Sequence, residues 1–420
     1  MSRTHRARDL LRLTLTPGVG PVRARALLAR FGSVEAIAAA SARELDEVRG
    51  IGEVTARQVR EGLAAADDAA DRELELAHSL GVSLIALGDE NYPPLLAELP
   101  DAPILLYVRG RLSPARDTYS VAIVGSRRCT AYGTEQAARF AMMLSQSGLV
   151  IVSGGARGID TAAHQGALRV NGATVAVLGC GLAHSYPPEN DELFRRIVDA
   201  GGAIVSELPL STSPAPENFP ARNRIISGMS LGVLVIEAPH GSGSLITAKH
   251  AMEAQGRDVM ALPGRVDSKA SEGSHELIRC GATLVTNPGD VLDALEQPAR
   301  HHFAGTHADR YAPAPKTDEK NDSPALFDPS QVVDGRTTAV APEHHAEVPL
   351  PSLTETQRRI VDLLGTPRTM EDLAEHSGMD VATLRAETTL LEIRRVIARN
   401  GSHLVRRGSE SQTRPPKKPL

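Results

Sequence analysis

The stretches VAIVGSRR at residues 121–128 and LVIVSGGARGID at residues 149–160 share one form, a short apolar run that leads into glycine and then arginine. Neither run alternates apolar with polar residues, which is typical of strands buried on both faces of a parallel sheet. Helical stretches separate similar runs further along the chain, at 174–178, 203–205, 233–236, 259–262 and 283–285. This alternation predicts an α/β fold with an extended Rossmann-like parallel-sheet core. We assign the core to residues 71–296, with residues 71–115 as its run-in.

On the amino-terminal side, residues 1–70 have the pattern of short helices. PGVG at 17–20 and RGIG at 49–52 each lead into a helical stretch, which is the form of a helix-hairpin-helix (SAM-like) module. Two glycines in such a turn expose backbone N–H groups to an anion. A helical module that only packs against the core is the alternative.

On the carboxyl-terminal side, residues 297–352 contain eight prolines and no sustained apolar period, which predicts a disordered linker. Residues 353–407 then predict a winged-helix domain. Thr354 is placed to cap its first helix, residues 370–376 and 381–391 fit a helix-turn-helix pattern, and 401–407 fit a wing. Residues 408–420 predict a disordered basic tail.

Composition excludes several classes of protein. The chain has 420 residues, a formal charge of −5, no tryptophan, six tyrosines and six phenylalanines, which is too few for an extensive base-stacking platform. Three scattered cysteines without a CxxC pair argue against disulfides and cysteine-based zinc sites and favour a reducing, cytoplasmic location. No run of about 18 apolar residues is present, so we expect no membrane span. The charge is uneven: residues 1–62 hold 11 arginines against seven acidic residues, and residues 394–420 hold eight basic residues against one.

Glycine-rich loops follow the predicted strands at the edge where open parallel sheets bind ligands. They are GSRR at 125–128, GGARG at 154–158, GCG at 179–181 and GSGSLIT at 241–247. Backbone N–H groups in such loops, with arginine side chains beside them, favour a phosphate ligand. The GxxxxGK[ST] string of a nucleotide-hydrolysing P-loop does not occur, and the glycine spacing does not fit a dinucleotide site.

Other polar residues near this edge carry alternatives. Arg222 and Arg224 flank Asn223 and can donate to phosphates, although Arg224 paired with an internal carboxylate is the alternative. Glu207 and Glu237 each end a strand, where an acid/base pair and structural caps are equally compatible with the pattern. His164 fits a packed or exposed position better than a catalytic one. We therefore predict no catalytic residue, no metal site and no cofactor.

The motifs together resemble the DNA-processing protein A (DprA/Smf) family. They are GSRR at 125–128, SGGARGIDTAAH at 153–164, LGCGL at 178–182, YPPEN at 186–190, SELPL at 206–210, FPARNRIISGMS at 219–230, SGSLITAKHAMEAQGRDVMALPG at 242–264 and LIRCGATLV at 277–285. YVRGRL at 107–112 fits the run-in, and the two terminal modules resemble accessory domains of the family.

The resemblance implies a protein that binds single-stranded DNA, protects incoming strands in natural transformation and helps load the RecA recombinase, as a homodimer and without enzymatic turnover. Carried over to matching positions, it implies DNA contacts at Gly125, Ser126, Arg127, Gly154, Gly155, Arg157, Gly158, Arg222, Asn223, Arg224, Ser244, Thr247 and Lys249. The family often has a basic residue just before SGSL. Gly241 stands there in this chain, which leaves that contact in doubt or passes it to His240.

Two other functions fit parts of the sequence. The core resembles nucleoside-monophosphate phosphoribohydrolases, but their PGGxGTxxE loop is replaced by HGSGSLITAKHAME at 240–253. A winged-helix regulator of duplex DNA is the second alternative. The predicted recognition helix at 381–391 carries Arg385 as its only basic residue, which makes it poorly suited to reading bases.

Overall fold

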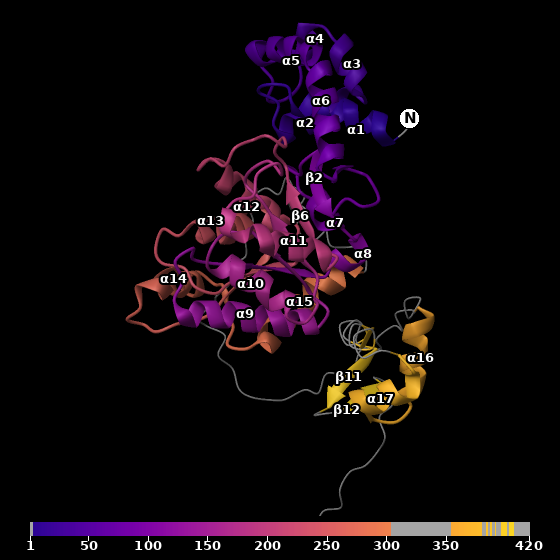
Figure 1. Cartoon of the computed structure of the whole chain (residues 1–420), viewed down its shortest axis with the longest axis vertical. Coiled ribbons are helices and arrows are strands. Elements are labelled where there is room, and N and C mark those ends of the chain that lie inside the picture. Colours follow the sequence, from indigo (N-terminus) through magenta and orange to yellow (C-terminus); the bar gives the residue numbers. More distant parts are fainter. Residues whose placement is uncertain are drawn as a thin grey trace, which may run out of the picture.

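The computed structural model describes residues 3–303, 354–379, 384, 387, 388, 391, 396–400 and 403–406 (Figure 1). The predicted linker beyond residue 303 and the tail at 408–420 lie outside these residues. Most of the predicted helix at 381–391 lies outside them as well.

A nine-stranded sheet in the order β1-β2-β6-β5-β4-β3-β7-β8-β9 forms the core. The strands from β6 to β9 along this order pair in parallel, whereas β1 pairs with β2, and β2 with β6, in antiparallel fashion. The bounds are β1 Val82–Ala86, β2 Leu105–Gly110, β3 Ser120–Val124, β4 Val150–Ser153, β5 Thr174–Val177, β6 Ala203–Ser206, β7 Gly232–Val235, β8 Asp258–Ala261 and β9 Thr283–Leu284. The predicted parallel strands are confirmed. Strands β1 and β2 were not predicted, and they lie in the run-in assigned to residues 71–115.

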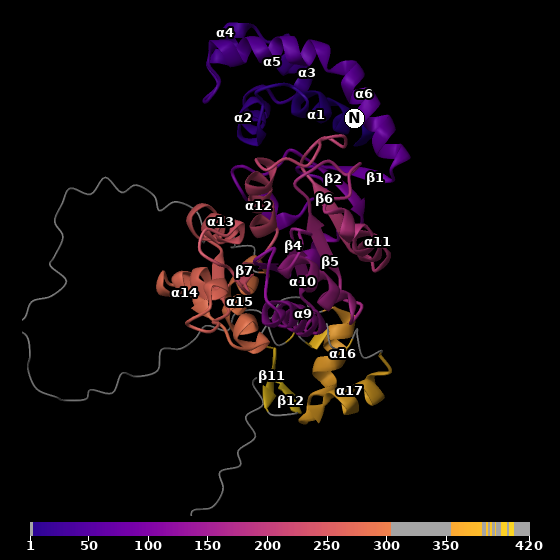
Figure 2. The same cartoon turned by 60° about the vertical axis from the view of Figure 1, so that its left-hand side comes forward.

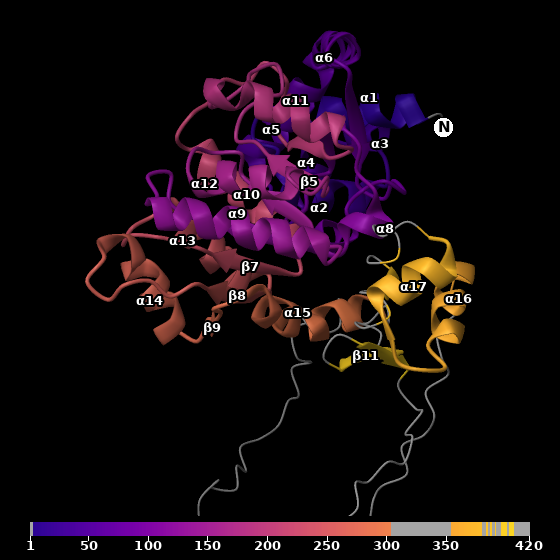
Figure 3. The ribbon, with the colours of Figure 1, turned by 60° about the horizontal axis from the view of Figure 1, so that its bottom comes forward.

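Helices cover both faces of this sheet. Apolar side chains of α9, α10 and α15 pack on one face, and those of α12 and α13 pack on the other. In Figure 3, α9 runs across the front of the molecule. The bounds are α7 Pro94–Ala97, α8 Pro114–Asp117, α9 Ala131–Gln146, α10 Ile159–Leu168, α11 Asp191–Asp199, α12 Asn218–Gly228, α13 Gly243–Lys249, α14 Glu272–Arg279 and α15 Pro288–Phe303, with short 3₁₀ or π turns η1 Pro188–Asn190, η2 His250–Ala254 and η3 Lys269–Ser271.

The amino-terminal module consists of α1 to α6 and covers the β1–β2 end of the sheet (Figure 2). The two predicted hairpin turns are present, and Arg23 links them by donating to the carbonyl oxygens of Gly18 and Gly50 at 2.7 and 2.9 Å. The bounds are α1 Arg3–Thr14, α2 Pro21–Phe31, α3 Val34–Ala39, α4 Ala42–Asp46, α5 Glu53–Ala65 and α6 Asp67–Ser79. The predicted boundary at residue 70 falls inside α6. The module shares one apolar core with β1, β2 and α11, so no break in packing separates it from the sheet.

The predicted start of the linker at residue 297 is wrong, since α15 continues to Phe303 and includes Pro298. Ala299 is buried against the sheet and extends the apolar stripe of this helix. Proline composition alone therefore placed the end of the core too early.

The carboxyl-terminal unit contains α16 Glu355–Leu363, α17 Met370–Ser377 and the strands β10 Arg368–Thr369, β11 Ile397–Asn400 and β12 His403–Arg406. Thr354 caps α16 as predicted, through a hydrogen bond from the backbone N–H of Gln357 at 3.2 Å. The β11–β12 hairpin takes the place of the predicted wing. Among the described residues, no helix is both long and apolar enough to cross a membrane.

Candidate nucleic-acid interface

The strand order reverses between β3 and β7, which are parallel neighbours at the centre of the sheet. Ligands of open parallel sheets bind outside the carboxyl ends of strands at such a switch point. The loops that leave the two strands are joined there, because the backbone N–H of Ser126 donates to the carbonyl oxygen of Glu237 at 2.7 Å. A cavity of about 610 Å³ opens over this junction.

Seven of the predicted contact residues line this cavity: Gly125, Ser126, Arg127, Arg222, Asn223, Ser244 and Thr247. Gly154 and Arg157 border a small adjoining hollow that also touches Arg127 and Arg222. The walls come from the loops after β3 and β7 and from α12 and α13. The loop after β3 is far from the other three along the sequence, and the sheet brings them together. Gly155, Gly158, Arg224 and Lys249 do not line either hollow.

Arg127 and Arg128 are exposed cations that line the cavity. Arg127 lies over an aromatic ring. Its guanidinium carbon lies 4.8 Å from the centroid of the Phe219 ring, and Phe219 stacks on Tyr186 with centroids 5.7 Å apart. A guanidinium over an aromatic face is held in place while its N–H donors stay available. Tyr186 also lines the cavity, and the sequence analysis gave it no role although it begins the YPPEN motif.

The glycine loop after β4 is already occupied by an anion from within the chain. The Asp160 carboxylate accepts from the backbone N–H groups of Gly154 at 3.1 Å and Ala156 at 3.3 Å. Burial raises the pKa of Asp160 to about 6, although the nearby Arg222 acts in the opposite direction. The predicted anion-binding geometry is therefore present, but these two N–H groups face an internal carboxylate.

Arg222 is buried behind the cavity wall. It donates to the carbonyl oxygens of Gly154, at 2.7 Å, and Val177, and its burial lowers its pKa to about 10. The adjacent Asn223 donates to the carbonyl oxygen of Gly243 at 3.3 Å and so ties α12 to the loop after β7. Both residues shape the cavity from within, and Arg222 adds positive charge beneath it.

Arg224 adopts the alternative that the sequence left open. Its guanidinium donates to both carboxylate oxygens of Glu207, at 2.5 Å for Oε2, and to the carbonyl oxygen of Asp101 at 2.9 Å. Glu237 is likewise committed, because its carboxylate accepts from the backbone N–H of Thr130 at 2.7 Å and from its hydroxyl at 2.8 Å. The two glutamates considered as an acid/base pair thus hold structural contacts on different elements.

Three further predicted positions lie at the periphery. Arg157 is exposed and donates through Nη2 to Glu189 at 2.6 Å, and Lys249 is exposed with Glu253 at 3.8 Å. His240 is exposed in the turn before α13. His164, by contrast, is fully buried with Nδ1 2.7 Å from the Thr174 hydroxyl, and burial lowers its pKa to about 3. Of the packed and exposed positions that the sequence left open for His164, the structure has the packed one.

Comparison with known proteins supplies the relationship that this geometry suggests. A family model for DNA recombination-mediator protein A matches residues 83–296, which is about half of the chain and includes every residue lining the cavity. The chain belongs to the DNA recombination-mediator protein A family, as the resemblance of its motifs predicted. Models of a SAM-like helix-hairpin-helix tandem and of the DprA winged-helix domain match residues 8–65 and 344–401.

Relatives of this family differ in how much of their length the chain matches. Protein Smf of Escherichia coli is 48% identical over 213 residues, which cover 51% of this chain and 56% of that protein. Protein Smf of Synechocystis is 40% identical over 282 residues, which cover 66% of this chain and 70% of that protein. The crystal structure of DNA processing protein A from Streptococcus pneumoniae superposes with a TM-score of 0.59 at 35% identity and covers 68% of this chain and 97% of that one.

Proposed function

We propose that this chain binds single-stranded DNA across the switch-point cavity, protects incoming strands during natural transformation and helps load the RecA recombinase. It acts as a cytoplasmic homodimer and performs no enzymatic turnover. The observation that carries the proposal is the cavity in the family-defining core, where the exposed Arg127 stands over Phe219 and Ser244 and Thr247 add hydroxyl groups to the lining.

The chemistry of the cavity suits a phosphate chain better than a set of bases. Arg127 and Arg128 offer charged donors, and Ser244 and Thr247 offer hydroxyls from the opposite wall. One stacked pair, Tyr186 and Phe219, leaves room for little more than a single base contact. A site that contacts phosphates and stacks on a single base binds a strand without reading its sequence.

Salt dependence measures this grip. If about four phosphates are neutralised at each site, the logarithm of the affinity for oligo-dT falls with the logarithm of salt concentration at a slope near ~−3, from about 0.7 per phosphate on single strands. A slope near zero would contradict phosphate binding.

The direct experiment is fluorescence anisotropy with labelled oligo-dT and with a duplex of equal length. We expect tighter binding of the single strand by wild type and a loss of about tenfold or more with Arg127→Ala, since one charged contact contributes about 1.5–3 kcal/mol. Arg139→Ala is the matched control, an exposed arginine of α9 that does not line the cavity. Equal affinities of all three proteins would reject the site.

RecA loading has its own test. RecA ATP hydrolysis on single strands coated with single-strand binding protein reports filament formation, and wild type is expected to raise it above the level with Arg127→Ala. Stimulation that is equal with both proteins would separate RecA loading from the cavity and contradict the proposal in this form.

A further inference from the structure

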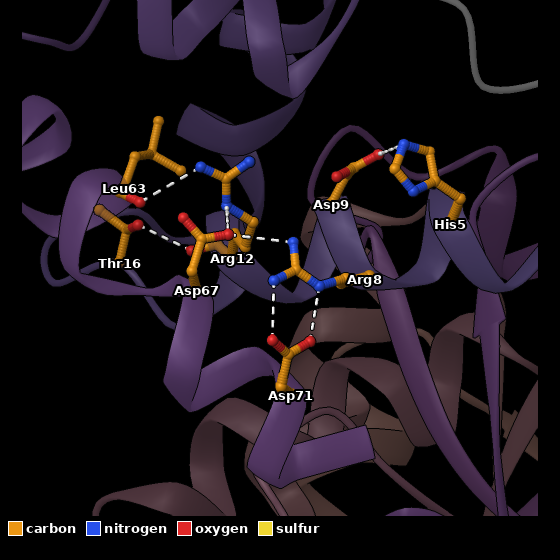
Figure 4. Close-up of polar contacts among 8 residues, drawn as sticks. All are labelled: His5, Arg8, Asp9, Arg12, Thr16, Leu63, Asp67 and Asp71. Atoms are coloured by element: carbon orange, nitrogen blue, oxygen red, sulfur yellow. Dashed lines mark hydrogen bonds and ion pairs between the residues drawn. The ribbon is translucent and has the colours of Figure 1, made fainter. Parts of the chain in front are cut away.

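A second candidate site lies in the amino-terminal module, far along the sequence from the DNA-binding loops. The carboxylates of Asp9 on α1 and Glu35 on α3 line a cavity of about 350 Å³ between this module and the β1–β2 end of the sheet. His5 lies one helical turn before Asp9 on α1 (Figure 4). No metal site was predicted from the sequence, and nothing in the sequence connects Glu35 with His5 and Asp9.

The three side chains converge closely. One ligand atom of each, an imidazole nitrogen of His5 and one oxygen each of Asp9 and Glu35, lie within 4.8 Å of one another. His5 Nε2 and Asp9 Oδ2 are already 3.7 Å apart. Ligand atoms bound to one zinc ion at about 2.0–2.2 Å lie roughly 3.3–3.6 Å apart, so closing the set needs shifts of about 1 Å.

The arginines around this cluster each have a hydrogen-bond or ion-pair partner of their own, and Arg25, which also lines the cavity, donates to the carbonyl oxygen of Leu99. Arg8 donates to Asp67 at 3.0 Å and to Asp71 at 2.6 Å, and Arg12 lies 3.1 Å from Asp67. These two arginines of α1 therefore turn toward α6 (Figure 4). Arg6 donates to the Leu87 carbonyl oxygen at 2.7 Å.

Asp9 is a buried carboxylate with the cations His5 and Arg12 near it. Its side chain is only 8% exposed, and among the described residues its sole ion-pair partner is His5. It also contacts the carboxyl group of Glu35. Two carboxyl groups facing each other at a cavity wall, with an imidazole beside them, form a set of donors that a cation would satisfy.

We propose that His5, Asp9 and Glu35 bind a divalent transition-metal ion of the zinc class. One imidazole nitrogen and two carboxylate oxygens provide three protein ligands, and the cavity supplies space for water in the remaining position. The ion links α1 to α3 and so braces the helix-hairpin-helix module where it packs on the sheet. This site is independent of the DNA-binding cavity.

The experiment uses the full chain, with isothermal titration calorimetry and thermal unfolding in ZnCl₂ and, separately, in MgCl₂. We expect the wild-type chain to bind one Zn²⁺ and to melt about 2–4 °C higher at saturating Zn²⁺. Substitution at the site is expected to abolish this binding. Mg²⁺ is expected to produce no comparable rise, because it prefers oxygen ligands and retains its water. Equal shifts with both ions would overturn the assignment of His5 as a ligand.

Asp9→Asn and His5→Gln test the ligands, with His78→Gln, an exposed histidine of α6, as the matched control. We expect both site variants to lose the Zn²⁺-dependent rise, while His78→Gln keeps it. The amide introduced by Asp9→Asn would still donate a hydrogen bond to Glu35, so this variant without metal is expected to melt at or above the wild-type temperature. Zn²⁺ binding by the site variants equal to that of wild type, or absence of the rise in wild type, would overturn the proposal.

Discussion

Two glycine loops leave neighbouring strands of this sheet with nearly the same sequence character, yet they face different anions. The loop after β4 directs the N–H groups of Gly154 and Ala156 at the buried carboxylate of Asp160. The loop after β3 leaves Arg127 exposed over Phe219 at the mouth of the cavity. One loop is satisfied within the fold, and the other has donors available to a ligand.

The difference teaches that glycine followed by arginine at a strand end identifies an anion-binding geometry but not the source of the anion. Asp160 stands two residues after Gly158, so the chain itself supplies the negative charge. The same holds for arginines: Arg127 is exposed, whereas Arg224 is paired with Glu207 inside the protein. Substitutions can test this division.

The largest effect is expected for Arg224→Met. Removing one partner of a largely buried ion pair leaves Glu207 without its cation, which costs about 3–5 kcal/mol in the free energy of unfolding. Arg127→Met, the same change at an exposed position, is expected to alter stability by less than about 0.5 kcal/mol. Urea denaturation measures both. If folded Arg224→Met also lost affinity for oligo-dT as Arg127→Met does, Arg224 would act as a DNA contact after all.

Asp160→Asn is expected to have an effect that depends on pH. The folded pKa of about 6 lies above the ordinary value of 3.8, so between these values the folded state holds more protons than the unfolded state. The stability contributed by this group is fully present below about pH 4 and is lost as pH rises through about 6. From pH 4 to pH 7, the unfolding free energy of the variant relative to wild type should therefore rise by about 2.4 kcal/mol.

Urea denaturation of both proteins at pH 4, 5, 6 and 7 checks this expectation, because contributions from all other carboxylates cancel in the difference. A difference that stays constant with pH would show that Asp160 titrates at its ordinary value. The contacts of the carboxylate in the loop would then offset the whole effect of its burial on the pKa.

The sequence was sufficient for the parallel sheet and for the edge at which its glycine loops gather, since buried runs such as 121–124 have no polar alternation and their loops must share one edge. It was insufficient for β1 and β2, whose pairing depends on long-range contacts with β6 and the helical module. Burial also cannot be read from residue type. Arg127 and Arg222 were both predicted to contact a phosphate, and only the packing of α12 shows that Arg222 is buried.

Gly158→Ala tests how tightly the two loops depend on each other. Gly158 has φ +77°, and a Cβ there would lie 2.3 Å from the carbonyl oxygen of Ser126, in the loop that carries Arg127. Gly241 has a similar φ of +73° with open space around it, so Gly241→Ala is the matched control. We expect Gly158→Ala to destabilise by about 2 kcal/mol more than the control, because overpacking adds to the backbone strain. Equal melting temperatures of the two variants would mean that the loops move apart freely.

The smallest effect is expected at Glu189, whose carboxylate holds Arg157 at the rim of the occupied loop. Both side chains are exposed, so solvent screens their pairing and it contributes little to stability. Glu189→Gln should release Arg157 for a phosphate, which would tighten oligo-dT binding by about two- to fivefold and steepen the salt slope by about 0.7. Glu192→Gln, an exposed glutamate paired with Arg195 at 2.9 Å, controls for the change in net charge. Anisotropy titrations at several salt concentrations distinguish the two variants: identical behaviour would show that Arg157 belongs entirely to its internal partner, and the loop after β4 would then contribute no contact to the strand.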